Sequence, residues 1–198
     1  MVSLHLDVRK LKSQYMVYRL IQFISFIISL SAIFLPWWEI RVYTYPGRLY
    51  IGSGYIHLIP PSYVSISDTL KYIRVFSLDQ RLMIILIFVL VLTALNGYLS
   101  LGVGLVIKGV IKSLKKIYLF ATICSTSALL LFVLALLLFS SDWPAILSPY
   151  GYFIDTTIMR EYLWGFSYGF YLALVSCMIN IINLSRLYMR NYILKSKI

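Results

Sequence analysis

Residues 35–45 read LPWWEIRVYTY, and within this stretch the chain changes character abruptly. An apolar run ends in a proline and two tryptophans, and an alternating segment that contains a glutamate and an arginine follows at once. Such alternation is typical of a β-strand with one face in water. Tryptophan at the end of a long apolar run is typical of a segment that leaves a lipid bilayer.

The composition of the whole chain agrees with a membrane protein. Of its 198 residues, 61% are hydrophobic and only 13% are charged. A water-soluble domain is usually about half apolar and about a quarter charged. So few charged groups cannot cover a water-facing surface of this size, so we expect the lipid bilayer to be the main partner of the chain.

Four apolar stretches lack Asp, Glu, Lys, Arg and His altogether. A helix needs roughly 20 apolar residues to cross the hydrocarbon layer, and a water-soluble helix of that length is charged on at least one face. The sequence therefore predicts an all-α membrane protein, a single domain over residues 1–198 that forms a four-transmembrane-helix bundle. The predicted spans are residues 21–38, 82–107, 117–139 and 163–184. The first could instead be a signal peptide, but its apolar run is too long, so we favour a retained span.

Lysine and arginine predict how the bundle is oriented. The two terminal segments and the loop at 108–116 carry twelve basic residues and one acid, whereas the loops 39–81 and 140–162 carry six of each. Basic residues collect on the cytoplasmic side of membrane proteins. We therefore expect both termini in the cytoplasm and the two balanced loops outside, in the cell membrane or in a host membrane if the protein is viral.

The first external loop is β-rich. Residues 40–45 and 48–59 show strand patterns on either side of Pro46 and Gly47, which predicts a hairpin or a small antiparallel sheet. Two prolines at 60 and 61 are expected to end the strand region. Residues 66–74 are amphipathic, and they suit either the outer leaflet or the surface of the hairpin.

Tryptophan and small residues add two further predictions. All four tryptophans lie near the outer ends of spans, where we expect them to act as interface anchors: Trp37, Trp38, Trp143 and Trp164. Span four has small residues every four positions, and such a ladder predicts close helix packing: Gly165, Gly169, Ala173 and Cys177. This packing would serve either the bundle itself or a homo-oligomer.

Asn96 and Asn180 are the notable polar residues inside the predicted spans. An amide in hydrocarbon requires a partner, so we expect a hydrogen bond between the second and fourth spans. The functional alternative is a pocket for a polar head group or a small molecule. Cys124 and Cys177 are predicted to lie at similar depth in the membrane. They either fill space as small apolar residues or pair as a disulfide or as metal ligands.

Motifs for chemistry are missing from the sequence. Neither His5 nor His57 lies in a span, so the chain cannot hold a haem between two intramembrane histidines. No span carries a carboxylate, and no nucleotide-binding or hydrolase motif is present. The net charge of +11 is spread between the spans rather than gathered into a nucleic-acid motif. We therefore expect no enzymatic activity, no cofactor, no metal site and no nucleic-acid partner.

A charge-free four-span bundle with a long β-rich first external loop, which begins at the aromatic pair Trp37–Trp38, resembles the claudin-type tetraspan proteins in topology. The loop has neither the Gly-Leu-Trp motif nor the two disulfide-bonded cysteines of that family. The resemblance therefore implies a topology and no functional residue.

These observations predict a non-enzymatic, multi-pass membrane protein whose external loops or fourth span contact partner proteins, in a cellular assembly or in a virus-infected host. One alternative is a binding or transport protein for a lipid or a small apolar molecule, with its cavity near Asn96 and Asn180. Another is an accessory subunit of a membrane enzyme complex.

Overall fold

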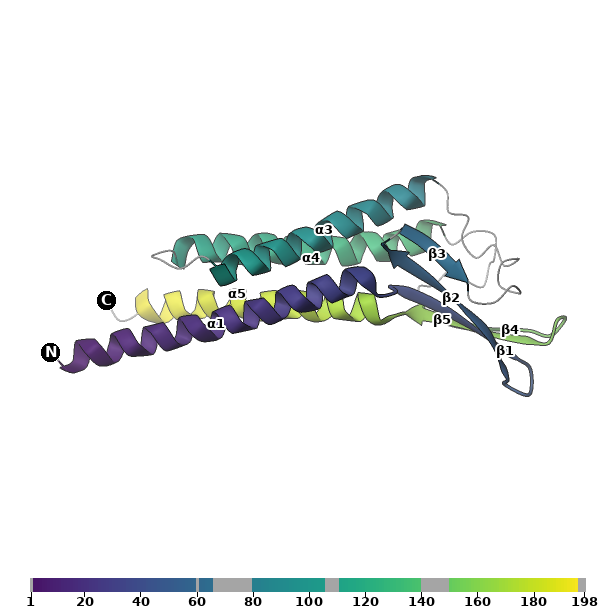
Figure 1. Cartoon of the computed structure of the whole chain (residues 1–198), viewed down its shortest axis with the longest axis horizontal. Coiled ribbons are helices and arrows are strands. Elements are labelled where there is room, and N and C mark those ends of the chain that lie inside the picture. The colour runs from purple at the N-terminus through teal and green to yellow at the C-terminus, as the bar shows by residue number, and fades with distance from the viewer. Residues whose placement is uncertain (1, 60, 66–79, 106–110, 140–149, 196–198) are drawn as a thin grey trace.

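A computed structural model describes residues 2–59, 61–65, 80–105, 111–139 and 150–195. Within these ranges, four long helices lie side by side, and a sheet extends beyond one end of them (Figure 1). The helices are α1 (Val2–Phe34), α3 (Gln80–Leu105), α4 (Ile111–Phe139) and α5 (Tyr168–Lys195).

Each of these helices contains a stretch that is long and apolar enough to cross a membrane. The stretches are Met16–Phe34, Met83–Gly102, Lys115–Leu138 and Tyr168–Met189. Large apolar side chains such as Phe88, Phe120 and Leu130 are more than half exposed on the outside of the bundle, as expected of a surface that faces lipid. The four predicted spans are thus present as helices.

The helices form a closed ring. α1 packs against α3 and α5, and α4 packs against the same two helices. The ends of α1 and α5 that lie near the chain termini are both at the end opposite the sheet (Figure 1). This arrangement follows from an even number of passes through the bundle.

The sheet has five antiparallel strands in the order β3-β2-β1-β5-β4. The strands are β1 (Trp38–Thr44), β2 (Tyr50–Leu58), β3 (Pro61–Ser65), β4 (Gly151–Asp155) and β5 (Arg160–Phe166). The predicted hairpin is present as β1 and β2. The sheet is larger than predicted, because both loops contribute strands and β1 pairs with β5 along its whole length.

Three predicted boundaries differ from the structure. The first span was predicted to run to residue 38, but α1 ends at Phe34, ahead of Pro36, and Trp38 already belongs to β1. Residues 163–166, which we expected to begin span four, belong to β5, and the helix starts at Tyr168. The apolar letters of this segment suit a helix or a buried strand equally, and pairing with β1 decides between them. Pro61 begins β3 instead of ending the strand region. An edge strand tolerates proline as its first residue, since no hydrogen bond has to be donated there. The amphipathic segment predicted at 66–74 lies outside the described residues.

Trp37 joins the sheet to the bundle. Its indole is fully buried, donates a hydrogen bond from Nε1 to the carbonyl oxygen of Ala32 (2.7 Å), and packs edge-on against Phe132, with ring centroids 5.1 Å apart. Its backbone N–H donates to the carbonyl of Ile56 in β2 (2.9 Å), and its carbonyl accepts from Ser167 (3.0 Å). One residue therefore contacts both the helices and the sheet.

Gly169 allows this close approach. A Cβ atom at position 169 would lie 2.5 Å from Cδ1 of Trp37 and 2.6 Å from the carbonyl oxygen of Leu35. Neither atom belongs to the flexible end of a side chain, so the backbone would have to move. By contrast, a Cβ atom at Gly102 would meet nothing within 4 Å.

We predict that Gly169→Ala lowers the free energy of unfolding by about 1–3 kcal/mol, because the added methyl group overpacks the junction. Gly102→Ala is the matched control, and it should be neutral or slightly stabilising because alanine favours a helix over glycine. Denaturation in detergent micelles, followed by tryptophan fluorescence, measures both variants. Equal stability of the two variants would contradict the role assigned to the junction.

Candidate functional site

The two faces of the sheet differ in chemistry. Side chains alternate along each strand, and cross-strand partners share a face. One face is apolar and buried, and its members include Trp38, Ile40, Val42, Ile56, Leu58, Tyr162 and Trp164. The opposite face, here called the outer face, carries the polar and aromatic residues. Because the bulk of the apolar residues is used on the buried face, the outer face is the part of the sheet available for recognition.

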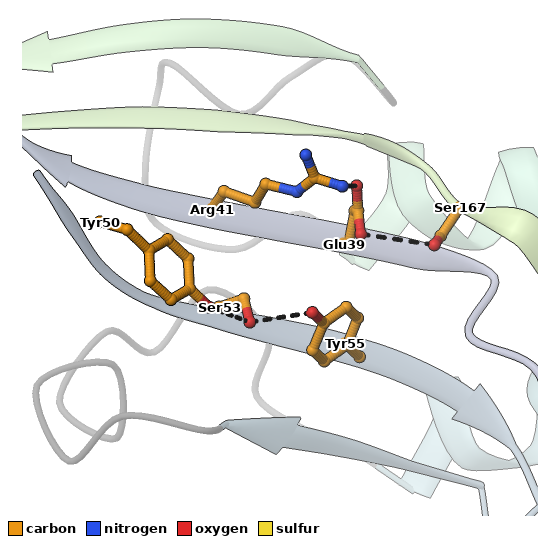
Figure 2. A network of polar contacts seen from close by, with 6 residues as sticks. All are labelled: Glu39, Arg41, Tyr50, Ser53, Tyr55 and Ser167. Carbon is orange, nitrogen blue, oxygen red and sulfur yellow. Dashed lines mark hydrogen bonds and ion pairs between the residues drawn. The ribbon is translucent and has the colours of Figure 1, made fainter. Parts of the chain in front are cut away.

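Charged residues on the outer face are paired with one another. Arg41 and Glu39 lie on the same side of β1 and form an ion pair, and Ser167 donates a hydrogen bond from Oγ to Oε2 of Glu39 (3.5 Å). These contacts are visible along β1 in Figure 2. The glutamate is the less exposed member, so its charge is neutralised within the sheet.

A chain of hydroxyl groups runs beside this ion pair on β2. Tyr50 donates from its hydroxyl to Oγ of Ser53 (2.7 Å), and Ser53 donates in turn to the hydroxyl of Tyr55 (3.0 Å; Figure 2). Ser53 is fully buried beneath the two rings. Its contacts fix the orientation of both tyrosines on the outer face.

The two hairpins are locked together at their far ends. The N–H of Tyr45 donates to the carbonyl of Met159 (2.9 Å). The guanidinium of Arg48 binds Glu161 through two contacts, Nε to Oε2 (3.2 Å) and Nη2 to Oε1 (3.1 Å). Glu161 is buried, so this two-point pairing compensates for removing its charge from water. The β1–β2 and β4–β5 hairpins therefore form one rigid surface.

Several titratable groups of the sheet have shifted pKa values, and His57 and Asp155 are two of them. Burial lowers the pKa of His57, so its imidazole is neutral at pH 7. The hydrogen bond from the Thr157 hydroxyl lowers the pKa of Asp155, the last residue of β4. Among the described residues, no three His, Cys, Asp or Glu side chains come together in a group that could hold a metal ion.

The predicted tryptophan anchors lie inside the protein. Trp37, Trp38 and Trp164 have exposed fractions of 0%, 1% and 4%, so their rings face the core of the sheet and bundle rather than lipid. Trp143 lies outside the described residues. The direction in which each ring points depends on the sheet, which the sequence did not predict in full.

The predicted ladder of small residues is divided between two elements. Gly165 lies in β5, where a Cβ atom would come within 2.4 Å of the Tyr150 ring. Gly169, Ala173 and Cys177 lie on α5 and are buried, so these small residues serve packing within the chain. Both cysteines, including Cys124, are free thiols.

Asn96 and Asn180 make direct contact at the centre of the bundle. Asn180 donates from Nδ2 to Oδ1 of Asn96 (2.7 Å). Asn96 donates in turn to the hydroxyls of Ser29 (2.7 Å) and Ser176 (2.9 Å). Gln22 donates from Nε2 to Oδ1 of Asn180 (3.5 Å). Three helices are therefore connected by one network of neutral side chains.

The members of this network that lie on α1 were not predicted from the sequence. One of them is Ser25, whose hydroxyl is 2.9 Å from that of Ser176. The sequence does contain a pattern that indicates these residues. Gln22, Ser25 and Ser29 recur at intervals of three and four residues, which places them on one face of a helix. A polar stripe inside a predicted span indicates the side that faces other helices.

No protein-family model matches the chain, and no curated protein matches it. The site is therefore interpreted from its own geometry.

We predict that Asn96→Leu and Asn180→Leu each lower the free energy of unfolding by about 1–2 kcal/mol, because each leaves the other amide without its buried partner. The double variant should lose less free energy of unfolding than the two single variants lose together, with a coupling energy of at least about 0.5 kcal/mol. Ile181→Leu, on the exposed side of α5, is the control and should have little effect. Strictly additive losses in a denaturation assay would show that the two amides act independently.

Proposed function

We propose that this chain is a non-enzymatic, multi-pass membrane protein that binds the external part of another membrane protein through the outer face of its sheet. The observation that carries the proposal is the composition of that face. It presents tyrosine side chains on a rigid scaffold, and its charges are already paired within the chain.

Exposed aromatic residues support a role in protein recognition. Tyr50 and Tyr152 are 57% and 50% exposed. Tyr152 is the cross-strand neighbour of Leu163, and Leu163 is the cross-strand neighbour of Arg41, so Tyr152 lies on the outer face. Tyrosine is enriched in protein interfaces, since it offers a large contact area, loses little conformational entropy and adds one hydroxyl. Side chains held by Ser53 lose still less freedom when a partner binds.

Paired charges support the same role. A charge that is buried by a partner must be compensated, and unpaired charges oppose association. On this face, Glu39 and Glu161 already have arginine partners. At the far end, Leu49, Ile158 and Met159 add exposed apolar side chains next to the locked hairpins. The surface thus combines apolar contact area with a low cost of desolvation.

The location of the partner follows from the proposed orientation. With both termini in the cytoplasm, as the basic residues favour, the sheet lies outside the cell or organelle membrane. A partner that meets it there is another membrane protein or a secreted one, and we favour the former because both would be confined to one bilayer. An accessory subunit of an enzyme complex would use the same surface, and the identity of the partner would distinguish it.

We predict that a photo-crosslinking amino acid at Tyr152 or Tyr50 captures a discrete protein on illumination of cells of the natural host. The same amino acid at Phe88 or Phe120, which are exposed on the helices, is the matched control and should not capture that protein. Mass spectrometry identifies the adduct, and a crosslinker placed in the identified partner should capture this chain in return.

Leu163→Glu should abolish the crosslink at Tyr152, because it replaces an apolar side chain of the contact surface by a charge that a partner would have to desolvate. A variant that folds normally yet crosslinks as before would argue against the outer face. Adducts formed only between two copies of this chain would replace the proposed partner by a homo-oligomer. If no adduct formed from any sheet position, the proposal would fail.

A further inference from the structure

The interior of the bundle changes from apolar to polar along its length. Near the sheet, the rings of Trp37, Phe132 and Phe170 pack together, with centroids 5.1–6.1 Å apart. Small and aliphatic residues, including Ala128 and Ala135, continue this apolar core. Beyond the Asn96–Asn180 pair, toward the end opposite the sheet, further buried polar side chains replace the apolar ones.

Three of these side chains have an atom without a hydrogen-bond partner. They are Gln22 on α1, Tyr118 on α4 and Asn183 on α5, each at most 1% exposed. The unsatisfied atoms are Oε1 of Gln22, the hydroxyl of Tyr118 and Nδ2 of Asn183. We call these three residues the inner polar site. The hydroxyls of Ser100 and Ser125, and Nη2 of Arg19 one helical turn from Gln22 on α1, are also buried and unsatisfied.

The three residues of the inner polar site lie in neighbouring turns of the bundle. Gln22 contacts Asn180, and Asn183 is one helical turn further along α5. Tyr118 packs against Leu187 and Leu184 on the next turn of the same helix. The hydroxyl of Tyr118 also approaches Gln22, although the two do not form a hydrogen bond of good geometry. Three helices therefore direct polar groups to a common region.

The chemistry of the unsatisfied atoms defines what would bind there. Oε1 of Gln22 accepts a hydrogen bond, Nδ2 of Asn183 donates one, and the tyrosine hydroxyl can do either. A single ligand that satisfies all three must both donate and accept. The three side chains are uncharged, so none of them requires a charged ligand. Water is the smallest molecule with this capacity, and buried waters in proteins typically make about three hydrogen bonds.

We propose that the inner polar site binds water, which bridges α1, α4 and α5 inside the part of the bundle that crosses the membrane. Buried polar atoms are nearly always satisfied in folded proteins, and lipid offers them no partner. The aromatic cluster of Trp37, Phe132 and Phe170 blocks the bundle toward the sheet. Water therefore reaches the site from the opposite end.

Proton-detected solid-state NMR tests the proposal directly, on the full chain in bilayers of lipid whose acyl chains, but not head groups, are deuterated. Magnetisation should transfer from water to the side-chain amides of Gln22 and Asn183. The backbone amides of Phe132 and Ala135, in the apolar half, are the controls and should receive none. Lack of transfer to both side-chain amides would overturn the proposal. So would transfer that comes only from protonated lipid head groups, because a lipid would then occupy the site.

Two variants test the same inference through stability. Tyr118→Phe removes one hydroxyl from the site, and Tyr188→Phe makes the same change on the exposed side of α5. If water links the site, Tyr118→Phe should lower the midpoint of thermal unfolding by about 2–4 °C, and Tyr188→Phe should shift it by less than about 1 °C. Tyr118→Phe should also weaken the transfer of magnetisation from water to the side-chain amide of Gln22. A raised midpoint for Tyr118→Phe would show that the hydroxyl is merely unsatisfied, and the proposal would be withdrawn.

Discussion

The backbone of Pro36 and Trp37 forms hydrogen bonds to both halves of the molecule. The carbonyl of Pro36 accepts from Gly169 at the start of α5 (2.8 Å), and Trp37 bonds to Ile56 in β2 and to Ser167 beside β5. A chain that leaves a membrane helix must find partners for its peptide groups at that point. Here the partners come from both loops, so the end of α1, the start of α5 and the centre of the sheet are fixed together. The absence of a side chain at Gly169 is what lets these segments approach so closely.

This junction also explains why the two ends of the bundle differ in composition. Near the sheet, tryptophan and phenylalanine fill the space between helices that are already fixed by the junction. Farther away, no sheet holds the helices, and amide and hydroxyl groups connect them instead. Apolar packing alone is a weak source of specificity in lipid, because the solvent is itself apolar. Directional hydrogen bonds between Asn96, Asn180 and Ser176 supply a defined register for these helices.

The predictable part of the fold is the part set by local composition. The spans were readable because no charge interrupts them, and the first hairpin because its strands flank Pro46 and Gly47. β5 was missed because its partner strand, β1, lies more than 100 residues earlier, and LWGF by itself reads as the beginning of a helix. The contact between Asn96 and Asn180 followed from the cost of an amide in lipid. Gln22 and Tyr118 did not stand out, because their importance depends on how α1 and α4 are rotated in the bundle.

The strand order has a consequence for the synthesis of the chain. β1 is the middle strand of the sheet, but its neighbour β5 is made only after three of the four helices. Until then, the edge of β1 that β5 will cover has unpaired N–H and C=O groups, a template to which other strands readily add. The native sheet is therefore completed only after β5 has been synthesised. During that interval the nascent protein is most exposed to mispairing with another chain, and a chaperone on the side of the membrane where the sheet emerges would act at this stage.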